Sequence, residues 1–245
     1  MKIIQPYTFY ECYSLRKIDI PSSVKEIGNG AFMDCSSLKS IIIPSSITGY
    51  GAQLFQGCRS LKQITISESV NEICNNAFCQ CSSLQQISIP KFVRRIGENA
   101  FKDCHSLKHV SFSSSSFLTI IDKSAFMNCV SLVDVKLPNS LSYIGDYAFS
   151  GCRSLIEISL PLTLSYIQAY AFSGCKSLIN IEIPPLIKRI TFGLFKGCTS
   201  LTNVAIPQSV VEIEAASFKD CPLIKKEVFP STVVYIDEFV FGRDQ

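Results

Sequence analysis

The chain has 245 residues, of which 47% are hydrophobic and 18% are charged, and its formal net charge is +3. A charge this small does not predict binding to nucleic acid or to an anionic membrane, both of which need concentrated basic surfaces. No apolar run approaches the ~20 residues that a membrane-spanning helix needs. The opening segment MKIIQPYTFYECYSL lacks the apolar stretch of a secretory signal peptide.

A repeat of 23 residues begins in this opening segment and runs through the chain. A recurring phenylalanine marks it: Phe9, Phe32, Phe55, Phe78, Phe101, Phe126, Phe149, Phe172, Phe195, Phe218 and Phe241. Only the step from Phe101 to Phe126 differs, at 25 residues. A fixed period of this length predicts a solenoid in which each coil packs on its neighbours. We therefore expect one domain over residues 1–245, built from about ten coils.

Each repeat predicts one short strand followed by a turn. In the unit after Cys35, Leu38, Ile41 and Ile43 face the core, because residues on one side of a strand alternate with those on the other. Pro44 ends this strand, since proline cannot donate to a sheet ladder. Residues 29–32 (Asn-Gly-Ala-Phe) predict a short helical turn at the corner of the coil.

Ten of the twelve cysteines form a second column, three residues after each of the first ten phenylalanines. Equivalent residues of adjacent coils lie ~4.8 Å apart, a separation that permits disulfides. A ladder of buried free thiols is the reading we favour, because free cysteine is among the most buried residue types. A disulfide framework is the alternative. Cys74 and Cys79 lie outside the column, and no histidine is near enough in sequence to complete a zinc site with them.

Two segments depart from the repeat. The linker SSSSFLTI, around residues 113–118, is two residues longer than its equivalents and lacks their proline, so we expect it to bulge and expose Phe117 or Leu118. In the last coil, residues 221–245, Leu223 is displaced from the leucine column and Glu227 falls at an inward strand position. This coil is expected to be irregular.

Both ends of the sequence stop within a repeat and so predict open strand edges, which can pair with another chain. The N-terminal edge, with Ile3, Ile4, Tyr7 and Phe9, is the more apolar one. We expect a monomer or weak self-association through this edge.

The unit x-Ser-Leu-x-x-Ile-x-Ile-Pro-x-x-Val-x-x-Ile-Gly-x-x-Ala-Phe-x-x-Cys resembles the BspA-like class of leucine-rich repeats over essentially the whole chain. The resemblance implies an α/β repeat solenoid, a curved horseshoe with a parallel β-sheet on its concave face. Members of the class are surface or secreted proteins of bacteria and anaerobic protists, associated with adhesion to host cells, host matrix proteins or other microbes. The motif is structural and brings no catalytic residue.

The outward strand residues line the concave face, which is the usual binding surface of a solenoid. The early coils present a basic strip, and the later coils present apolar side chains bordered by acidic ones. The candidate partner-binding residues are Lys39, Lys62, Lys108, Val133, Asp134, Ile156, Glu157, Ile179 and Glu182. Scattered surface lysines are ordinary, whereas adjacent exposed apolar side chains are typical of interaction sites.

A second candidate surface is formed by tyrosines. Tyr143 and Tyr147 recur one repeat later as Tyr166 and Tyr170, beside Arg189. Tyrosine is enriched at protein interfaces. The alternative is a half-buried column that covers the convex core.

Enzyme motifs are absent, since the chain has no P-loop, no nucleophile elbow and no zinc-protease helix. Of its two histidines, His109 falls at an outward strand position, and neither a cofactor nor a metal is expected. We predict a non-enzymatic protein-interaction module, an adhesin-like surface protein that binds host or microbial proteins. The alternative is an intracellular scaffold that uses the same face, which unpaired thiols and the missing signal peptide favour. The location is left open between cell surface and cytoplasm.

Overall fold

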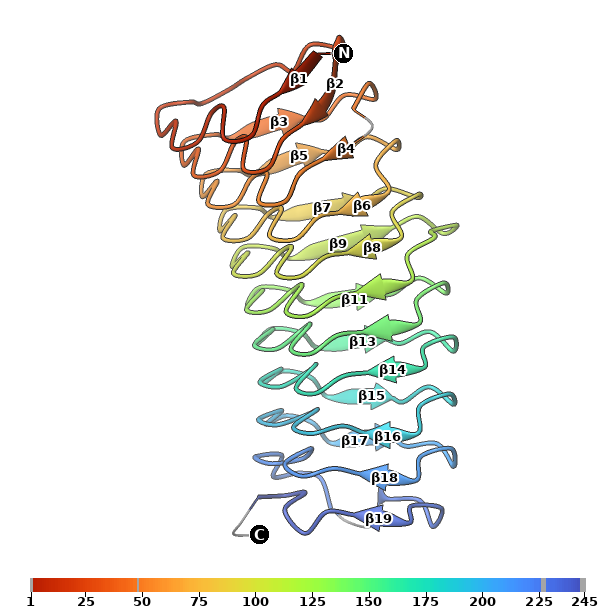
Figure 1. Ribbon diagram of the computed structural model, residues 1–245. Coiled ribbons are helices and arrows are strands. Elements are labelled where there is room, and N and C mark those ends of the chain that lie inside the picture. Colours follow the sequence, from red (N-terminus) through yellow and green to blue (C-terminus); the bar gives the residue numbers. More distant parts are fainter. Residues whose placement is uncertain (1, 48, 226–227, 243–245) are drawn as a thin grey trace.

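The computed structural model describes residues 2–47, 49–225 and 228–242. The chain forms a column of stacked coils, with the first strand at one end of the column and the last strand at the other (Figure 1). Within the described residues there are nineteen short strands, β1–β19, and no α-helix. The predicted parallel repeat solenoid of about ten coils is confirmed.

The first ladder consists of the strands that the sequence predicts. Its members are β3 (Ser40–Ile42), β5 (Gln63–Thr65), β7 (Gln86–Ile89), β9 (His109–Phe112), β11 (Asp134–Lys136), β13 (Glu157–Ser159), β15 (Asn180–Glu182) and β17 (Asn203–Ala205). The paired strands are parallel, and equivalent residues of adjacent coils lie side by side, as Val135 and Ile158 do. In most of these strands the middle residue is buried and its two neighbours are exposed, because successive side chains point to opposite faces.

A second ladder on another side of the coils was not predicted. Its members are β1 (Lys2–Ile4), β2 (Val24–Ile27), β4 (Gly49–Tyr50), β6 (Glu72–Ile73), β8 (Arg95–Ile96), β10 (Ile120–Ile121), β12 (Tyr143–Ile144), β14 (Tyr166–Ile167), β16 (Arg189–Ile190), β18 (Glu212–Ile213) and β19 (Tyr235–Ile236). Most of these strands have two residues. Such a strand is too short to show the alternation by which strands are recognised in a sequence.

The predicted helical turn at residues 29–32 is wrong, because this corner is a run of turns. Gly30 and Asp34 have left-handed backbone conformations, with φ of 56° and 57°, and the equivalent positions of the other coils repeat this pattern. A right-handed helix cannot continue through such residues. The N–H of Phe32 donates instead to the carbonyl of Leu54 in the next coil, at 3.1 Å. The corner is therefore held by bonds between coils.

One continuous hydrophobic core lies beneath both ladders. The rings of Phe126 and Phe149 stack with their centroids 5.2 Å apart and their planes 6° from parallel, and most other phenylalanines of the column stack in the same way. The Cys152 thiol donates to the carbonyl oxygen of Phe126 at 3.2 Å, and the other column thiols from Cys35 to Cys221 make the same contact. All twelve cysteines are free, so the thiol ladder describes this structure and the disulfide framework does not.

Of the two apolar side chains in the two-residue insertion, only one is exposed. Phe117 is 41% exposed and stacks on Phe92, at a centroid distance of 5.8 Å, whereas Leu118 is fully buried. The ammonium group of Lys91 lies over both rings, 5.4 and 5.6 Å from their centroids. The repeat then resumes, since Ile121 pairs with Ile96.

In the last coil the second ladder continues, because β19 pairs in register with β18. Ile224 is buried at the position of the leucine column, and Leu223, one residue earlier, is exposed. Thus isoleucine replaces the missing leucine. Glu227 lies outside the described residues. Over the described part of the chain, no helix is present that could span a membrane.

Candidate functional site

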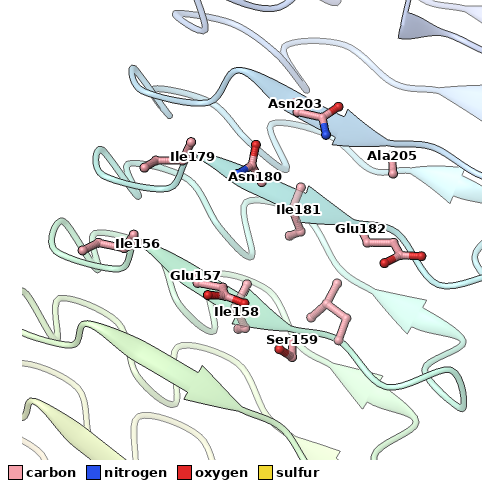
Figure 2. Close-up of a pocket in the computed structure, with 11 residues that line it drawn as sticks. Ile156, Glu157, Ile158, Ser159, Ile179, Asn180, Ile181, Glu182, Asn203 and Ala205 are labelled. Carbon is pink, nitrogen blue, oxygen red and sulfur yellow. The ribbon is translucent and has the colours of Figure 1, made fainter.

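A groove of about 500 Å³ crosses the first ladder at β13, β15 and β17 (Figure 2). Its wall includes both apolar and polar side chains. The lining residues are Ile156, Glu157, Ile158, Ser159, Leu160, Ile179, Asn180, Ile181, Glu182, Asn203 and Ala205. Four of the nine residues proposed from the sequence are thus brought together in one place: Ile156, Glu157, Ile179 and Glu182.

The apolar edge of the groove is formed by Ile156 and Ile179, which occupy equivalent positions in adjacent coils. Their side chains are 47% and 42% exposed. The N–H of Ile179 donates to the carbonyl of Ile156 at 3.4 Å, so the two residues are neighbours across the ladder. Figure 2 shows both side chains at the same edge of the ladder, just before β13 and β15. They form a small contiguous apolar surface open to solvent.

The polar part of the groove carries two carboxylates and two amides. Glu157, Asn180 and Asn203 begin β13, β15 and β17, and Glu182 pairs with Ala205 at the other end of these strands. No lysine, arginine or histidine is among the described residues that line the groove. Within the described ranges, no ion pair includes Glu157 or Glu182.

Asp134 and Val133 lie beside the groove and not in it. Asp134 pairs in register with Glu157, so two carboxylates are adjacent on the ladder face. On its other side, the carboxylate of Asp134 is 3.6 Å from Nδ1 of His109. These two residues and Lys136 line a smaller hollow of about 320 Å³. Val133 is half-buried.

The predicted basic strip lies away from the groove. Lys39, Lys62 and Lys108 are exposed in the coils of β3, β5 and β9. Sequence reasoning missed one apolar residue in this region, Ile42, whose side chain is 65% exposed on β3. Its position, four residues after the column leucine, is the one that Glu182 occupies in its own coil, and this shared position could have identified it.

The tyrosines form two pairs across adjacent coils, one at the corner of the coil and one on the second ladder. Tyr147 and Tyr170 are half-buried and stack at 4.8 Å, so they cover the corner of the coil. Tyr166 is 62% exposed, with its ring 6.4 Å from that of Tyr143. Tyr166 also lines a groove of about 560 Å³. Of these four tyrosines, Tyr166 is exposed and the other three are half-buried.

Charged side chains on the second ladder are paired across coils. Nη1 of Arg95 is 2.8 Å from the Glu72 carboxylate, and Nη2 of the same side chain contacts Asp122. Arg189 lies 3.4 Å from Glu212, one coil further on. Among the described residues, no group of three histidine, cysteine or acidic side chains is arranged to hold a metal ion.

The family model described as "BspA type Leucine rich repeat region" matches residues 2–120 and 119–245, in 6 copies. A comparison with curated proteins finds no match. Among solved structures, the leucine-rich repeat protein of T. pallidum (TpLRR) is similar, with 29% identity and a TM-score of 0.63, over 77% of this chain and 79% of that one.

Two further solved structures are similar over more of the chain. A leucine-rich cell surface protein from Faecalibacterium prausnitzii has 25% identity and a TM-score of 0.62, over 99% of this chain and 80% of that one. The pneumococcal vaccine antigen PcpA has 24% identity and a TM-score of 0.55, over 96% of this chain and 71% of that one. The second of these likenesses concerns the fold alone.

Proposed function

The chain belongs to the BspA-type leucine-rich repeat family, and from this premise we propose that it is a non-enzymatic protein-interaction module, an adhesin-like surface protein that binds a host or microbial protein. The observation that carries the proposal is the groove across β13, β15 and β17, with Ile156 and Ile179 exposed at its edge. Adjacent apolar side chains that the fold leaves open to solvent are typical of surfaces that a partner covers.

The rest of the first ladder supports the same use. Its outward residues stand on a rigid array of parallel strands, so binding orders few side chains and little of the contact energy is lost to entropy. Covering the exposed parts of Ile156 and Ile179 would contribute about 1 kcal/mol each. The likeness to a protein described as a cell surface protein supports the adhesin-like role.

An intracellular scaffold that uses the same groove is the second candidate. All twelve cysteines are free, and free thiols persist most readily in a reducing compartment. Surface biotinylation of intact source cells, followed by fractionation, separates the two locations. Labelling of the chain before lysis supports the adhesin-like role, and labelling only after lysis supports the scaffold.

Substitution of Ile156 by glutamate tests the groove. A partner is first isolated by a pull-down that compares host matrix proteins with a lysate of the source organism. We expect Ile156→Glu to weaken its binding by about tenfold, which corresponds to ~1.4 kcal/mol, with an unchanged melting temperature. Ile42→Glu is the matched control, because Ile42 is an exposed isoleucine on the same ladder outside the groove.

Two results would contradict this assignment. A large fall in the melting temperature of Ile156→Glu would show that the side chain belongs to the core. Equal binding by both variants would show that the partner docks elsewhere on the molecule.

We also propose that the 245-residue chain is a monomer or self-associates weakly through the face of its first coil. An apolar hollow of about 460 Å³ lies there, lined by Ile3, Ile4, Phe9 and Val24 among others. Sedimentation over a range of concentrations measures the association, which the double variant Ile4→Lys and Phe9→Asp should abolish. A mass that rises with concentration equally in both proteins would exclude this face.

A further inference from the structure

We propose that the groove across β13, β15 and β17 recognises a basic segment of the partner protein. An arginine or lysine of the partner would lay its alkyl stem on Ile156 and Ile179 and direct its charged end to Glu157 and Glu182. This inference rests on the proposed function, since it names the chemistry of the partner that the same groove binds.

The shape of the groove fits such a side chain. Ile156 and Ile179 form an apolar edge, and the next residue in the chain after Ile156 is Glu157, which carries a carboxylate. Long basic side chains bury their methylene stems on apolar surface and keep their charged ends in a polar environment. An aliphatic edge beside carboxylates offers both environments over the length of one side chain.

The charge of the groove selects a cation. Glu157 and Glu182 lie on adjacent strands and two positions apart along them, on the same outward face (Figure 2). In the part of the chain that the structure describes, no basic residue lines the groove. Arginine offers five N–H donors in a planar fork and lysine offers three. Asn180, between the two glutamates, adds an amide oxygen that can accept one of these hydrogen bonds.

The neighbouring coil makes the same region more acidic. Asp134 is directly beside Glu157 on the ladder, and like charges in directly adjacent positions of a sheet are destabilising. On this face, His109 lies 3.6 Å from Asp134, and Lys136 pairs in register with Ser159 at the groove wall. No ion pair within 4.0 Å joins Lys136 to Asp134 or Glu157 in the described part of the chain. A cation brought by a partner would relieve the repulsion that the chain itself leaves in place.

The opposite end of the ladder explains why a basic segment would be placed here. Lys39, Lys62 and Lys108 are exposed in the earlier coils and repel a cation. The first ladder is thus basic towards β3 and acidic towards β15. This distribution of charge favours the groove as the location for a segment with a basic side chain beside an apolar one.

Selection from a display library of random dodecapeptides tests the inference. The library is panned on the full chain, and the affinities of the selected peptides are then measured for four proteins: the wild type, E157Q/E182Q, I156S/I179S and the control K39Q/K62Q. We expect selected peptides to contain arginine or lysine next to an aliphatic or aromatic residue. They should bind E157Q/E182Q about tenfold more weakly or worse, lose affinity at high salt, and bind K39Q/K62Q as they bind the wild type.

The variants distinguish failure of this inference from failure of the proposed function. Peptides without enriched basic residues, or peptides that bind E157Q/E182Q as tightly as the wild type, would overturn the inference. If these peptides nevertheless lose affinity for I156S/I179S, the groove is a docking site for an uncharged segment and the proposed function stands. Full affinity for both double variants would overturn both. Circular dichroism melts of all four proteins verify that each is folded.

Discussion

The two ladders run along the same coils and have the same 23-residue register, yet they differ in how their charged side chains are paired. On the second ladder, Arg95 lies between Glu72 and Asp122 and contacts both carboxylates. On the first ladder, Asp134 and Glu157 are adjacent carboxylates. Glu157 makes no ion pair among the described residues. At Arg95 and Arg189 the second ladder pairs its charges between coils, whereas the first ladder leaves Glu157 without an ion pair among the described residues.

This difference indicates which charged residues stabilise the fold. In a solenoid, one substitution in a repeat is enough to place a cation beside an anion of the adjacent coil, because equivalent residues are neighbours. The second ladder uses this opportunity at Arg95 and Arg189. On the first ladder, His109 lies 3.6 Å from Asp134, but among the described residues no ion pair includes the adjacent Glu157. Its position beside Asp134 costs stability and leaves its carboxylate open to a cation of a partner.

Both ladders stand on one core. Alkaline pH should therefore lower the stability of both at once, and this should be the largest effect. Burial raises the pKa of the interior thiols above their ordinary value of 9.0, to about 12 for Cys152. The folded thiol keeps its proton to a higher pH than the unfolded one, so its stabilising effect is complete below about pH 9 and is lost as the pH rises towards the folded pKa. Because the unfolded thiol ionises, each thiol should lower the free energy of unfolding by about 1 kcal/mol near pH 10.

The thiols concerned are fully buried: Cys58, Cys81, Cys104, Cys129, Cys152, Cys175 and Cys198. Together they should lower the free energy of unfolding by several kcal/mol between about pH 8 and about pH 10. Urea denaturation at the two pH values measures this change, and peptide binding to the groove should be lost in parallel. Stability that stays constant over this range would show that the thiols are accessible to solvent.

Replacing one ring of the phenylalanine stack should have the next largest effect. Phe149 is fully buried between Phe126 and Phe172, with centroid distances of 5.2 and 5.7 Å. Phe149→Ala should cost about 3–5 kcal/mol. The half-buried Phe9 has a stacking neighbour on one side, Phe32, and Phe9→Ala should cost less. Equal losses in urea denaturation would mean that the coils do not depend on neighbours on both sides.

Much of this fold could be predicted from the sequence because its core positions repeat visibly. Phe149 and Cys152 belong to columns that can be followed through the chain. The second ladder could not be found, because an outward residue and an inward isoleucine, such as Tyr143 and Ile144, do not make a pattern of period two. The helical turn predicted at residues 29–32 overlooked Gly30, a residue type that favours the left-handed conformation, and the equivalent residue of a later coil, Tyr147, gives no such sign.

The residue types of the candidate site could be predicted from the sequence, but not which of its charged side chains have ion-pair partners. Ile156 and Ile179 follow from strand register alone, and the structure brings them to one groove with Glu157 and Glu182. Whether a charge is paired depends on contacts between coils. Arg95 reaches Asp122, two residues beyond its ladder partner Ile120, as Arg189 reaches Glu214 beyond Glu212, and these contacts appear only once the pairing of the second ladder is known.

Removing the cation from the second ladder should have a moderate effect. Arg95→Met leaves Glu72 and Asp122 without their shared partner. Because the arginine side chain is 40% exposed, solvent weakens the attraction, and the loss should be about 1 kcal/mol. The loss measured by urea denaturation should shrink at high salt. Lys108→Met is the matched control on the first ladder, since Lys108 is exposed and has no ion pair within 4.0 Å in the described residues, and it should leave stability unchanged.

Removing an anion from the first ladder should have the smallest effect on stability. The change should be a gain, whereas Arg95→Met should cause a loss. Glu157→Gln keeps the shape of the side chain and removes the repulsion from the adjacent Asp134. We therefore expect the free energy of unfolding to rise by a few tenths of a kcal/mol, while binding of the selected basic peptides falls. Thermal melting and peptide titration on the same sample measure both quantities.

Glu72→Gln on the second ladder is the control, since it removes one of the two partners of Arg95 and should lower stability. If Glu157→Gln destabilised the protein as much as this control, the carboxylate would be part of the fold, and the contrast between the two ladders would disappear.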